Sequence, residues 1–207
     1  MPVDETKVIP TPTPVEPGGI EAVTLRPATP ADAEALALVG AATFLEAFTW
    51  MLPGPDIIAH CAKNHTAAAY REYFAAPATR ITLATSGADA PIGYAMLVAP
   101  ELPTFAVLPS DIELKRIYLF SRFRAAPVLD AAGTLLKDLR PAQALLDAAI
   151  ADARALGRTR LLLGTHAGNL RAITFYRRNG FTEAGTRTFQ VGSQICSDLI
   201  FEKIIDR

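Results

Sequence analysis

The amino-acid sequence predicts a single mixed α/β domain. Its 207 residues, half of them apolar and a fifth charged, have ordinary globular composition and are enough to bury a substantial core. Stretches with apolar residues at helical spacing alternate with short apolar runs typical of strands. The expected order of elements is β, α, α, β, β, β, α, β, α, β, β, which favours one sheet with helices packed against it.

The N-terminal part divides into a tail and the start of the domain. Residues 1–20 contain five prolines and Gly18-Gly19 and have almost nothing to bury, so we expect a disordered tail. The folded domain is expected over residues 22–207, beginning with a strand at 22–26. Thr29-Pro30-Ala31-Asp32 then supplies a helix N-cap, a proline at the first helical position and an acidic residue three positions on.

The remaining elements follow from apolar spacing and from the turn residues between them. Pro141 opens the strongest helix, and Gly157 is its expected stop. Helices are also expected at 56–62, 67–74 and 170–179, and strands at 80–85, 91–98, 111–121, 160–165, 182–191 and 198–205.

Charge and cysteine content exclude several classes of partner. A net charge of −1 gives no basic field for nucleic acid or an anionic membrane. Cys61 and Cys196 are the two cysteines, and with three histidines they form no metal-ligand cluster, so we expect no metal. Neither a secretory signal nor a run of 18 apolar residues is present, and the expected location is cytoplasmic.

The most informative stretch runs from Asn169 to Phe181. Asn169 can cap a helix, Tyr176 falls on the inner face near its end, and Gly180 stands where a left-handed residue ends a helix. The spacing Asn169-x-x-Ala172-x-x-Phe175-Tyr176, preceded by a strand, resembles the acetyl-CoA-dependent N-acetyltransferases of the GNAT superfamily. Without that resemblance, the segment reads as an amphipathic helix whose aromatic side chains fill a core.

The resemblance covers residues 22–205 and implies both a fold and a co-substrate. The GNAT fold has a mixed, mostly antiparallel sheet of about six or seven strands flanked by four or five helices. It implies acetyl-CoA as co-substrate, with Asn169 as a cofactor contact. It further implies that Tyr176, which also contacts the cofactor, protonates the departing thiolate. A phenol with an ordinary pKa of about 10 suits that role because it is neutral at pH 7.

The strand 111–121 resembles the central fourth strand of the family. Ile117, Tyr118 and Leu119 would then offer main-chain contacts to the pantetheine arm, and a backbone N–H near a bulge would polarise the thioester carbonyl. Glu113, near the start of this strand, is the candidate general base, acting directly or through water. A buried strand with solvated charges at Lys115 and Arg116 is the alternative interpretation.

The phosphate-binding loop departs from the family pattern, in which glycine N–H groups cradle the pyrophosphate at a helix N-terminus. The corresponding residues here run from Lys137 through Arg140 and Pro141 to Ala142, followed by Gln143. About fifteen extra residues, 124–138, precede them. Either Arg140 and Lys137 bind the pyrophosphate by charge, or the loop is closed and cofactor affinity is weak. Lys137, Arg140, Ala142 and Gln143 are the predicted cofactor-binding residues of this loop.

Two further segments are similar to the bacterial spermidine/spermine-type branch of the family. In that branch the first helices and the last hairpin frame the acceptor pocket, which makes Phe44 and Phe48 candidate substrate contacts. Ser193 and Gln194 stand where that branch carries acidic residues, and this argues against a polycation as substrate.

Together these features predict acetyl transfer to a primary amine, either a small amine or a polyamine, by direct attack in a ternary complex. Two alternatives stay open: a non-catalytic CoA-fold sensor or interaction protein, and an enzyme that acetylates a protein amine. The resemblance also admits a homodimer.

Overall fold

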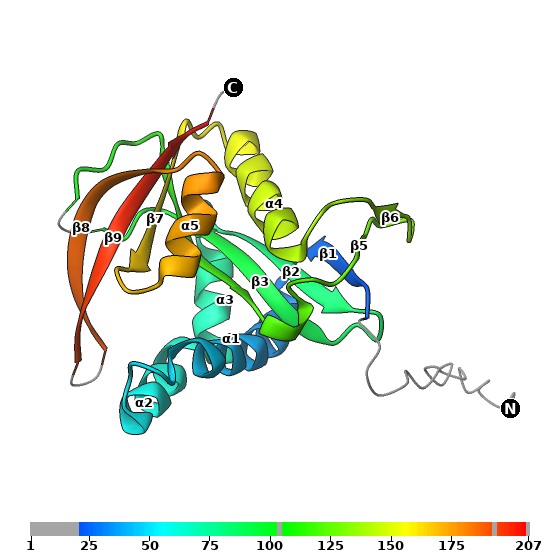
Figure 1. Ribbon diagram of the computed structural model, residues 1–207, viewed down its shortest axis with the longest axis horizontal. Coiled ribbons are helices and arrows are strands. Elements are labelled where there is room, and N and C mark those ends of the chain that lie inside the picture. Colours follow the sequence, from blue (N-terminus) through cyan, green and yellow to red (C-terminus); the bar gives the residue numbers. More distant parts are fainter. Residues whose placement is uncertain (1–20, 103–104, 192–193, 206–207) are drawn as a thin grey trace, which may run out of the picture.

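A nine-stranded mixed sheet forms the centre of the protein, shown in Figure 1 as a computed structural model. The structure describes residues 21–102, 105–191 and 194–205, so the expected disorder of the tail at 1–20 stays a prediction. Across the sheet the strands are ordered β6-β5-β1-β2-β3-β4-β7-β9-β8. They are β1 (Val23–Pro27), β2 (Arg80–Ser86), β3 (Pro91–Val98), β4 (Asp111–Leu119), β5 (Val128–Leu129), β6 (Leu135–Leu136), β7 (Arg160–His166), β8 (Thr182–Val191) and β9 (Gln194–Ile204).

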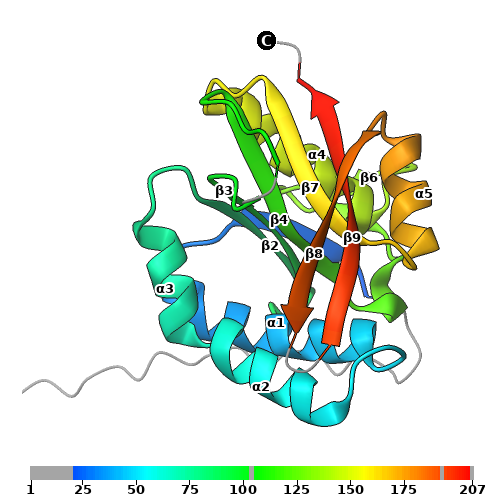
Figure 2. The ribbon, with the colours of Figure 1, turned by 90° about the vertical axis from the view of Figure 1, so that its left-hand side faces the viewer.

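Five α-helices cover the two faces of this sheet. They are α1 (Ala33–Phe48), α2 (Gly54–Asn64), α3 (Ala67–Ala75), α4 (Pro141–Ala155) and α5 (Leu170–Arg178), with short 3-10 turns at Pro30–Asp32 and Ser121–Phe123. Helices α1 and α3 pack on one face, where Leu36 and Tyr70 meet Met96, and α4 and α5 pack on the other, where Leu145 meets Leu161 (Figure 2). The mixed α/β class predicted from the sequence is confirmed.

The local signals for the helices act as expected. At the start of the 3-10 turn before α1, Asp32 Oδ2 accepts a hydrogen bond of 2.7 Å from the backbone N–H of Thr29, which completes a capping box. Gly180 follows α5 with a φ of 76°, a left-handed conformation that a residue without Cβ adopts at no steric cost. No helix in the described residues is long and apolar enough to cross a membrane.

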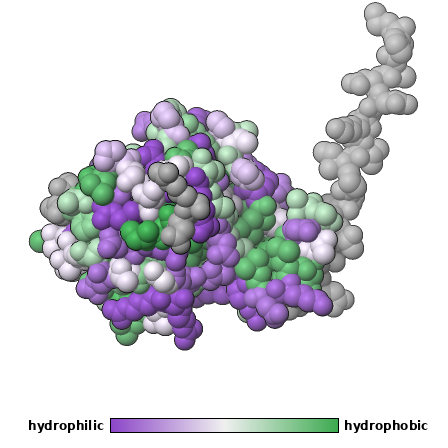
Figure 3. All heavy atoms as spheres, turned by 90° about the horizontal axis from the view of Figure 1, so that it is seen from above, coloured by the Kyte–Doolittle hydropathy of each residue, from purple (hydrophilic) through white to green (hydrophobic). Residues whose placement is uncertain are grey.

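The strand count differs from the expected six or seven because residues 124–138 contain two further short strands. In this segment β5 and β6 form a hairpin, and β5 pairs in parallel with β1 through Val23 and Val128. The segment therefore extends the sheet beyond β1. In the view of Figure 3 apolar atoms gather on the lobe at the right, the side on which Figure 1 places this hairpin, and both leucines of β6 are exposed.

Strands β4 and β7 separate in the middle of the sheet. They are parallel neighbours, yet they pair only from Asp111 with Arg160 to Glu113 with Leu162. Beyond this point β4 continues to Leu119 and β7 to His166 without pairing with each other. The backbone N–H and C=O groups on their facing edges therefore make no hydrogen bonds between these two strands. This separation opens the sheet at its centre.

Candidate active site

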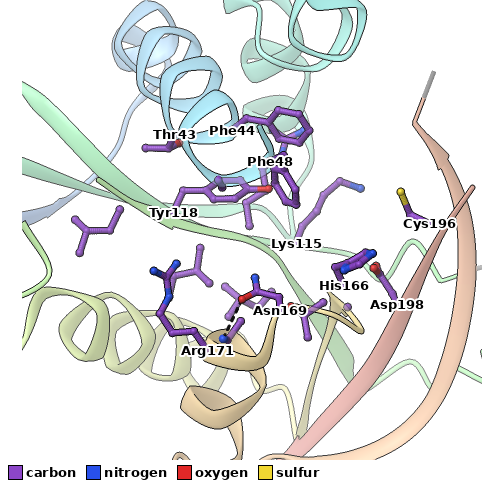
Figure 4. A pocket seen from close by; sticks show the side chains of 18 of the residues that line it. Thr43, Phe44, Phe48, Lys115, Tyr118, His166, Asn169, Arg171, Cys196 and Asp198 are labelled. Atoms are coloured by element: carbon purple, nitrogen blue, oxygen red, sulfur yellow. Dashed lines mark hydrogen bonds between the residues drawn. The ribbon is translucent and has the colours of Figure 1, made fainter. Parts of the chain in front are cut away.

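A cavity of about 550 Å³ lies where β4 and β7 separate. Its floor is β4, one wall comes from α1 and α2, and the other walls come from the end of β7, the start of α5 and the hairpin of β8 and β9. Figure 4 shows side chains from all of these elements converging on the same space. Of the residues predicted from the sequence, the cavity is lined by Phe44, Phe48, Glu113, Ile117, Tyr118, Leu119, Ala142, Asn169 and Tyr176.

The start of α5 is fixed by Asn169. Its Oδ1 accepts a hydrogen bond of 3.2 Å from the backbone N–H of Ala172, the bond drawn as a dashed line in Figure 4. The capping role predicted for Asn169 is therefore confirmed. The cap aims the first turn of α5, with Arg171, at the cavity.

Tyr176 lies on the buried face of α5, near its end. Its ring makes edge contacts with Phe175 and Phe181, and the residue is 6% exposed. Burial raises the pKa of Tyr176, and the neighbouring Tyr118 raises it further, so both phenols are neutral at pH 7. In the described part of the chain the Tyr176 hydroxyl has no hydrogen-bond partner, so its proton is available to a ligand.

The floor strand β4 contains a bulge at Lys115. Its pairing with β3 shifts by one residue, since Met96 is opposite Arg116 but Leu97 is opposite Leu114. The bulge breaks the alternation of side chains along β4. Tyr118, Arg116 and Glu113 consequently lie opposite residues of β3 that all face α1 and α3.

Glu113 is buried, with 2% exposure, at the point where β4 parts from β7. Its Oε2 accepts a hydrogen bond of 2.7 Å from the backbone N–H of Glu101, and its Oε1 lies 3.9 Å from Arg187 Nη1. Both contacts fix the position of the carboxylate group. The base role of Glu113 stays a prediction, and its position in the cavity is compatible with it.

An aromatic wall rises from α1 and α2. The rings of Phe44 and Phe48 lie 4.5 Å apart, and the imidazole of His60 stacks on Phe44 at 4.1 Å with an interplanar angle of 10°. Burial lowers the pKa of His60 to about 4, and Arg116 and Lys63 contribute to the same shift. His60 is therefore neutral at physiological pH, and this wall is uncharged.

The loop before α4 brings Ala142 to the cavity but not the other predicted residues, Lys137, Arg140 and Gln143. Lys137 and Arg140 are exposed, Arg140 Nη1 donates to the Ala125 carbonyl at 2.8 Å, and Gln143 Nε2 donates to Asn179 Oδ1 at 2.8 Å. Their cofactor-binding roles stay predictions that this geometry does not favour.

Two other cations line the cavity at this end. They are Arg124, which follows the 3-10 turn after β4, and Arg171, which Figure 4 shows pointing into the cavity from the first turn of α5. Burial lowers the pKa of the Arg124 guanidinium, and the charge of Arg171 lowers it further, while Glu46 opposes the shift. The two cations are thus close enough to repel each other, which makes this end of the cavity attractive to an anion.

The sequence interpretation missed a group of charged residues at the opposite end of the cavity. Arg187 of β8 lies between two carboxylates: it contacts Glu113, and its Nε and Nη2 both lie 3.1 Å from Asp198 Oδ2. Figure 4 shows His166 beside Asp198. The backbone N–H of Gly168 donates to His166 Nδ1 at 3.0 Å, so Nδ1 acts as an acceptor in this site. In the sequence these residues are far apart, and no spacing connects them.

Among the described residues, no group of three or more His, Cys, Asp and Glu side chains is arranged to hold a metal ion.

Known proteins share both the motif and the fold. The model of the acetyltransferase (GNAT) family matches residues 141–181, from the start of α4 to Phe181. N-acetyltransferases of Mycobacterium tuberculosis and Mycobacterium bovis, both described as uncharacterized, are 31% identical over 170 residues, covering 82% of this chain and 95% of theirs. The chain belongs to the GNAT family of N-acetyltransferases.

Solved GNAT structures agree with the fold. The PaiA N-acetyltransferase of Thermoplasma acidophilum in complex with coenzyme A is similar with a TM-score of 0.65 at 18% identity, covering 88% of this chain and 99% of that one. The YncA acetyltransferase of Salmonella typhimurium with acetyl-CoA is similar with a TM-score of 0.58 at 17% identity, covering 90% and 95%. The GNAT fold and family expected from the sequence are confirmed, and the spermidine/spermine-type branch stays a prediction.

Proposed function

We propose that this GNAT enzyme transfers an acetyl group from acetyl-CoA to a primary amine, by direct attack of the amine in a ternary complex. One observation carries the proposal: the unpaired edge of β4 beyond Glu113 lies in the same cavity as Tyr176. The two solved relatives described above are complexes with CoA or acetyl-CoA. Bound there, acetyl-CoA would supply the acetyl thioester and the thiolate leaving group.

The residues present fit an acetyl-CoA molecule along this edge. Between Leu114 and Leu119, alternate N–H and C=O groups of β4 face the opening and can pair with the amides of a pantetheine arm as an added strand would. A backbone N–H beside the bulge at Lys115 can polarise the thioester carbonyl. Ile117 and Tyr118 provide the central contacts.

The phosphates would lie at the other end, by the helix N-termini of α4 and α5. Ala142 lines the cavity in the first turn of α4, where unsatisfied N–H groups attract an anion. We assign the charge-assisted bonds to Arg124 and Arg171 in place of Lys137 and Arg140.

The transfer itself needs two proton movements. The amine nitrogen bonds to the acetyl carbon and gives up a proton to Glu113, directly or through water, while the carbon–sulfur bond breaks. Tyr176 donates its proton to the departing sulfur, and the products are an N-acetylated amine and CoA. The buried, neutral phenol of Tyr176 suits this role.

The two alternatives have weaker support. A non-catalytic CoA-fold protein was suggested by the altered phosphate loop, but Arg124 and Arg171 supply positive charge at that end of the cavity. Acetylation of a protein amine requires an acceptor end open to a peptide chain, whereas here residues of α1, α2 and the β8–β9 hairpin line it on several sides.

Calorimetry with acetyl-CoA, followed by a thiol-release assay over small amines, polyamines and peptides, tests the proposal. We expect saturable acetyl-CoA binding and release of CoA that depends on a small amine. Failure to bind acetyl-CoA at millimolar concentration would retire the proposal in favour of the non-catalytic alternative. Turnover with peptides alone would favour a protein substrate.

A further inference from the structure

The acceptor end of the cavity contains a buried cation with no counter-ion. Arg116 of β4 is 8% exposed, and its Nη1 has no hydrogen-bond partner among the described residues. Its guanidinium lies over the rings of Tyr70 and Tyr73, at 5.5 and 5.3 Å from their centroids. No carboxylate of the described chain pairs with it.

This arrangement is costly unless a ligand completes it. Taking a guanidinium out of water costs several hydrogen bonds, and contacts with aromatic faces offset only part of that loss. Native proteins rarely bury an unsatisfied charged group without a functional reason. A planar guanidinium with an unpartnered Nη1 is suited to a carboxylate, which it can bind through two parallel hydrogen bonds.

The same cavity contains a buried carboxylate with one unsatisfied oxygen. Asp198 of β9 is 4% exposed; its Oδ2 binds Arg187, whereas its Oδ1 has no partner in the described chain. Because Arg187 is shared between Asp198 and Glu113, the trio carries one net negative charge. An ammonium group would supply the donor that Oδ1 needs.

The same cavity also has an apolar surface. Phe44, Phe48, Met51, Leu52 and Val191 line this part of the cavity, and the stacked, neutral His60 adds no charge. A polyamine has further ammonium groups along its chain. Any that lay against this surface, or against Arg116, would have no negatively charged partner there. The wall therefore suits an apolar side chain and disfavours a polyamine.

Given the acetyltransferase function proposed above, we propose that the acceptor is a small amino acid with an apolar side chain. Arg116 binds its carboxylate, Asp198 Oδ1 accepts a hydrogen bond from its amino group, and its side chain lies against Phe44 and Phe48. The product is then the N-acetyl amino acid.

The first experiment needs no variant, because it compares acceptors that differ in one group. Phenylalanine, phenylalaninamide and phenethylamine share the amine and the ring, and only the first carries a carboxylate. We expect kcat/KM from thiol release, and affinity from calorimetry, to be roughly ten- to a hundredfold higher for phenylalanine. Leucine and 3-methylbutylamine form a second pair, and spermidine should be a poor substrate.

The second experiment assigns the preference to its residue. Arg116→Met should abolish the advantage of phenylalanine over phenethylamine, so that the ratio of kcat/KM for the two acceptors falls towards one. Arg71→Met is the matched control, because Arg71 is an exposed arginine of α3 that pairs with Glu34, outside the cavity. Asp198→Asn should weaken both acceptors to a similar extent.

Two outcomes overturn the inference, and they are separable from failure of the proposed function. If the parent enzyme acetylates phenethylamine as well as phenylalanine, or better, the carboxylate site is refuted while acetyl transfer stands. The same holds if Arg116→Met folds and leaves the ratio of the two acceptors unchanged. If no amine of a broad panel releases CoA, the proposed function itself is refuted, and this inference with it.

Discussion

The guanidinium of Arg187 lies directly against Gly164 of β7: a Cβ added to Gly164 would come within 2.6 Å of Arg187 Nη2 and 2.9 Å of Cζ. The absence of a side chain at Gly164 thus leaves the space in which Arg187 joins Glu113 to Asp198. Gly164, which has no side chain, therefore determines where Arg187 can lie between Glu113 of β4 and Asp198 of β9.

The substitution Gly164→Ala tests this relationship. The added methyl should displace the end of the Arg187 side chain, which is flexible, so the free energy of unfolding should change by only about 1 kcal/mol. The acceptor KM should rise about tenfold as the Arg187–Asp198 pair is disturbed, with acetyl-CoA affinity unchanged. Steady-state kinetics and calorimetry measure both quantities, and an unchanged KM would show that Arg187 has no part in acceptor binding.

Tyr176→Phe removes the proposed general acid with little change in volume. We expect kcat to fall by about 10²–10⁴-fold, because the thiolate must then leave without a positioned proton donor. Acetyl-CoA affinity should be nearly unchanged, since the hydroxyl is a small part of the binding surface. Phe175→Leu is a matched control on the same helix. A Tyr176→Phe variant that keeps most of its turnover would exclude the assignment.

Charge removal at the phosphate end separates the two sets of candidate cations. Arg171→Ala and Arg124→Ala should each lose about 1.5–3 kcal/mol of acetyl-CoA binding, roughly ten- to a hundredfold in affinity. Arg140→Ala should have little effect, because that guanidinium is engaged with the Ala125 carbonyl. Binding to the parent should weaken with added salt. The opposite pattern, a loss at Arg140 and none at Arg171, would favour the assignment made from the sequence.

Acid should destabilise the protein through its buried histidines. Burial lowers the pKa of His60 to about 4 and that of His65 to about 3, both below the ordinary 6.5. As the pH falls from 6.5 towards these values, the unfolded chain binds protons that the folded chain does not, so stability is lost. The raised pKa of Asp198, caused by its burial and opposed by Arg187, acts in the opposite direction.

A variant isolates the contribution of His60 from that of the other groups. His60→Phe keeps a ring stacked on Phe44 but cannot be protonated. Urea denaturation at pH 7.5 and pH 4.5 should show a smaller loss of stability for His60→Phe than for the parent. The contribution of Asp198 cancels in this comparison, and that of His65 becomes smaller as well, because His60 contributes to the lowered pKa of His65. Equal losses in the two proteins would mean that His60 is protonated as readily when folded as when unfolded.

The sequence predicted those parts of the fold that depend on local signals. The capped helix from Asn169 to Gly180 is an example, since its start, its buried face and its end are each coded by adjacent residues. The hairpin of β5 and β6 was missed because it consists of two-residue strands whose partner, β1, is about a hundred residues away along the chain. Nothing in its own sequence shows that pairing.

The charged residues Arg116, Asp198 and Arg187 of the acceptor end were missed for a similar reason. Regular alternation along β4 would place Arg116 on the face opposite to Glu113, and the sequence interpretation considered Arg116 only as a solvated charge in its alternative reading of the strand. The bulge at Lys115 brings both onto one face, and a bulge depends on the register with β3. Asp198 is likewise recognisable only once β9 is paired with β7 and β8.

The separation of β4 from β7 has a consequence for how such an enzyme can diversify. Every residue type except proline has both a backbone N–H and a backbone C=O group. Most substitutions between Leu114 and Leu119 therefore preserve the hydrogen-bonding groups proposed to bind acetyl-CoA. The acceptor end depends instead on individual side chains, those of α1, α2, β8 and β9 together with Glu113 and Arg116 of β4. A lineage can therefore keep one acetyl donor while a few point mutations exchange one amine for another, without passing through a form that has lost its cofactor.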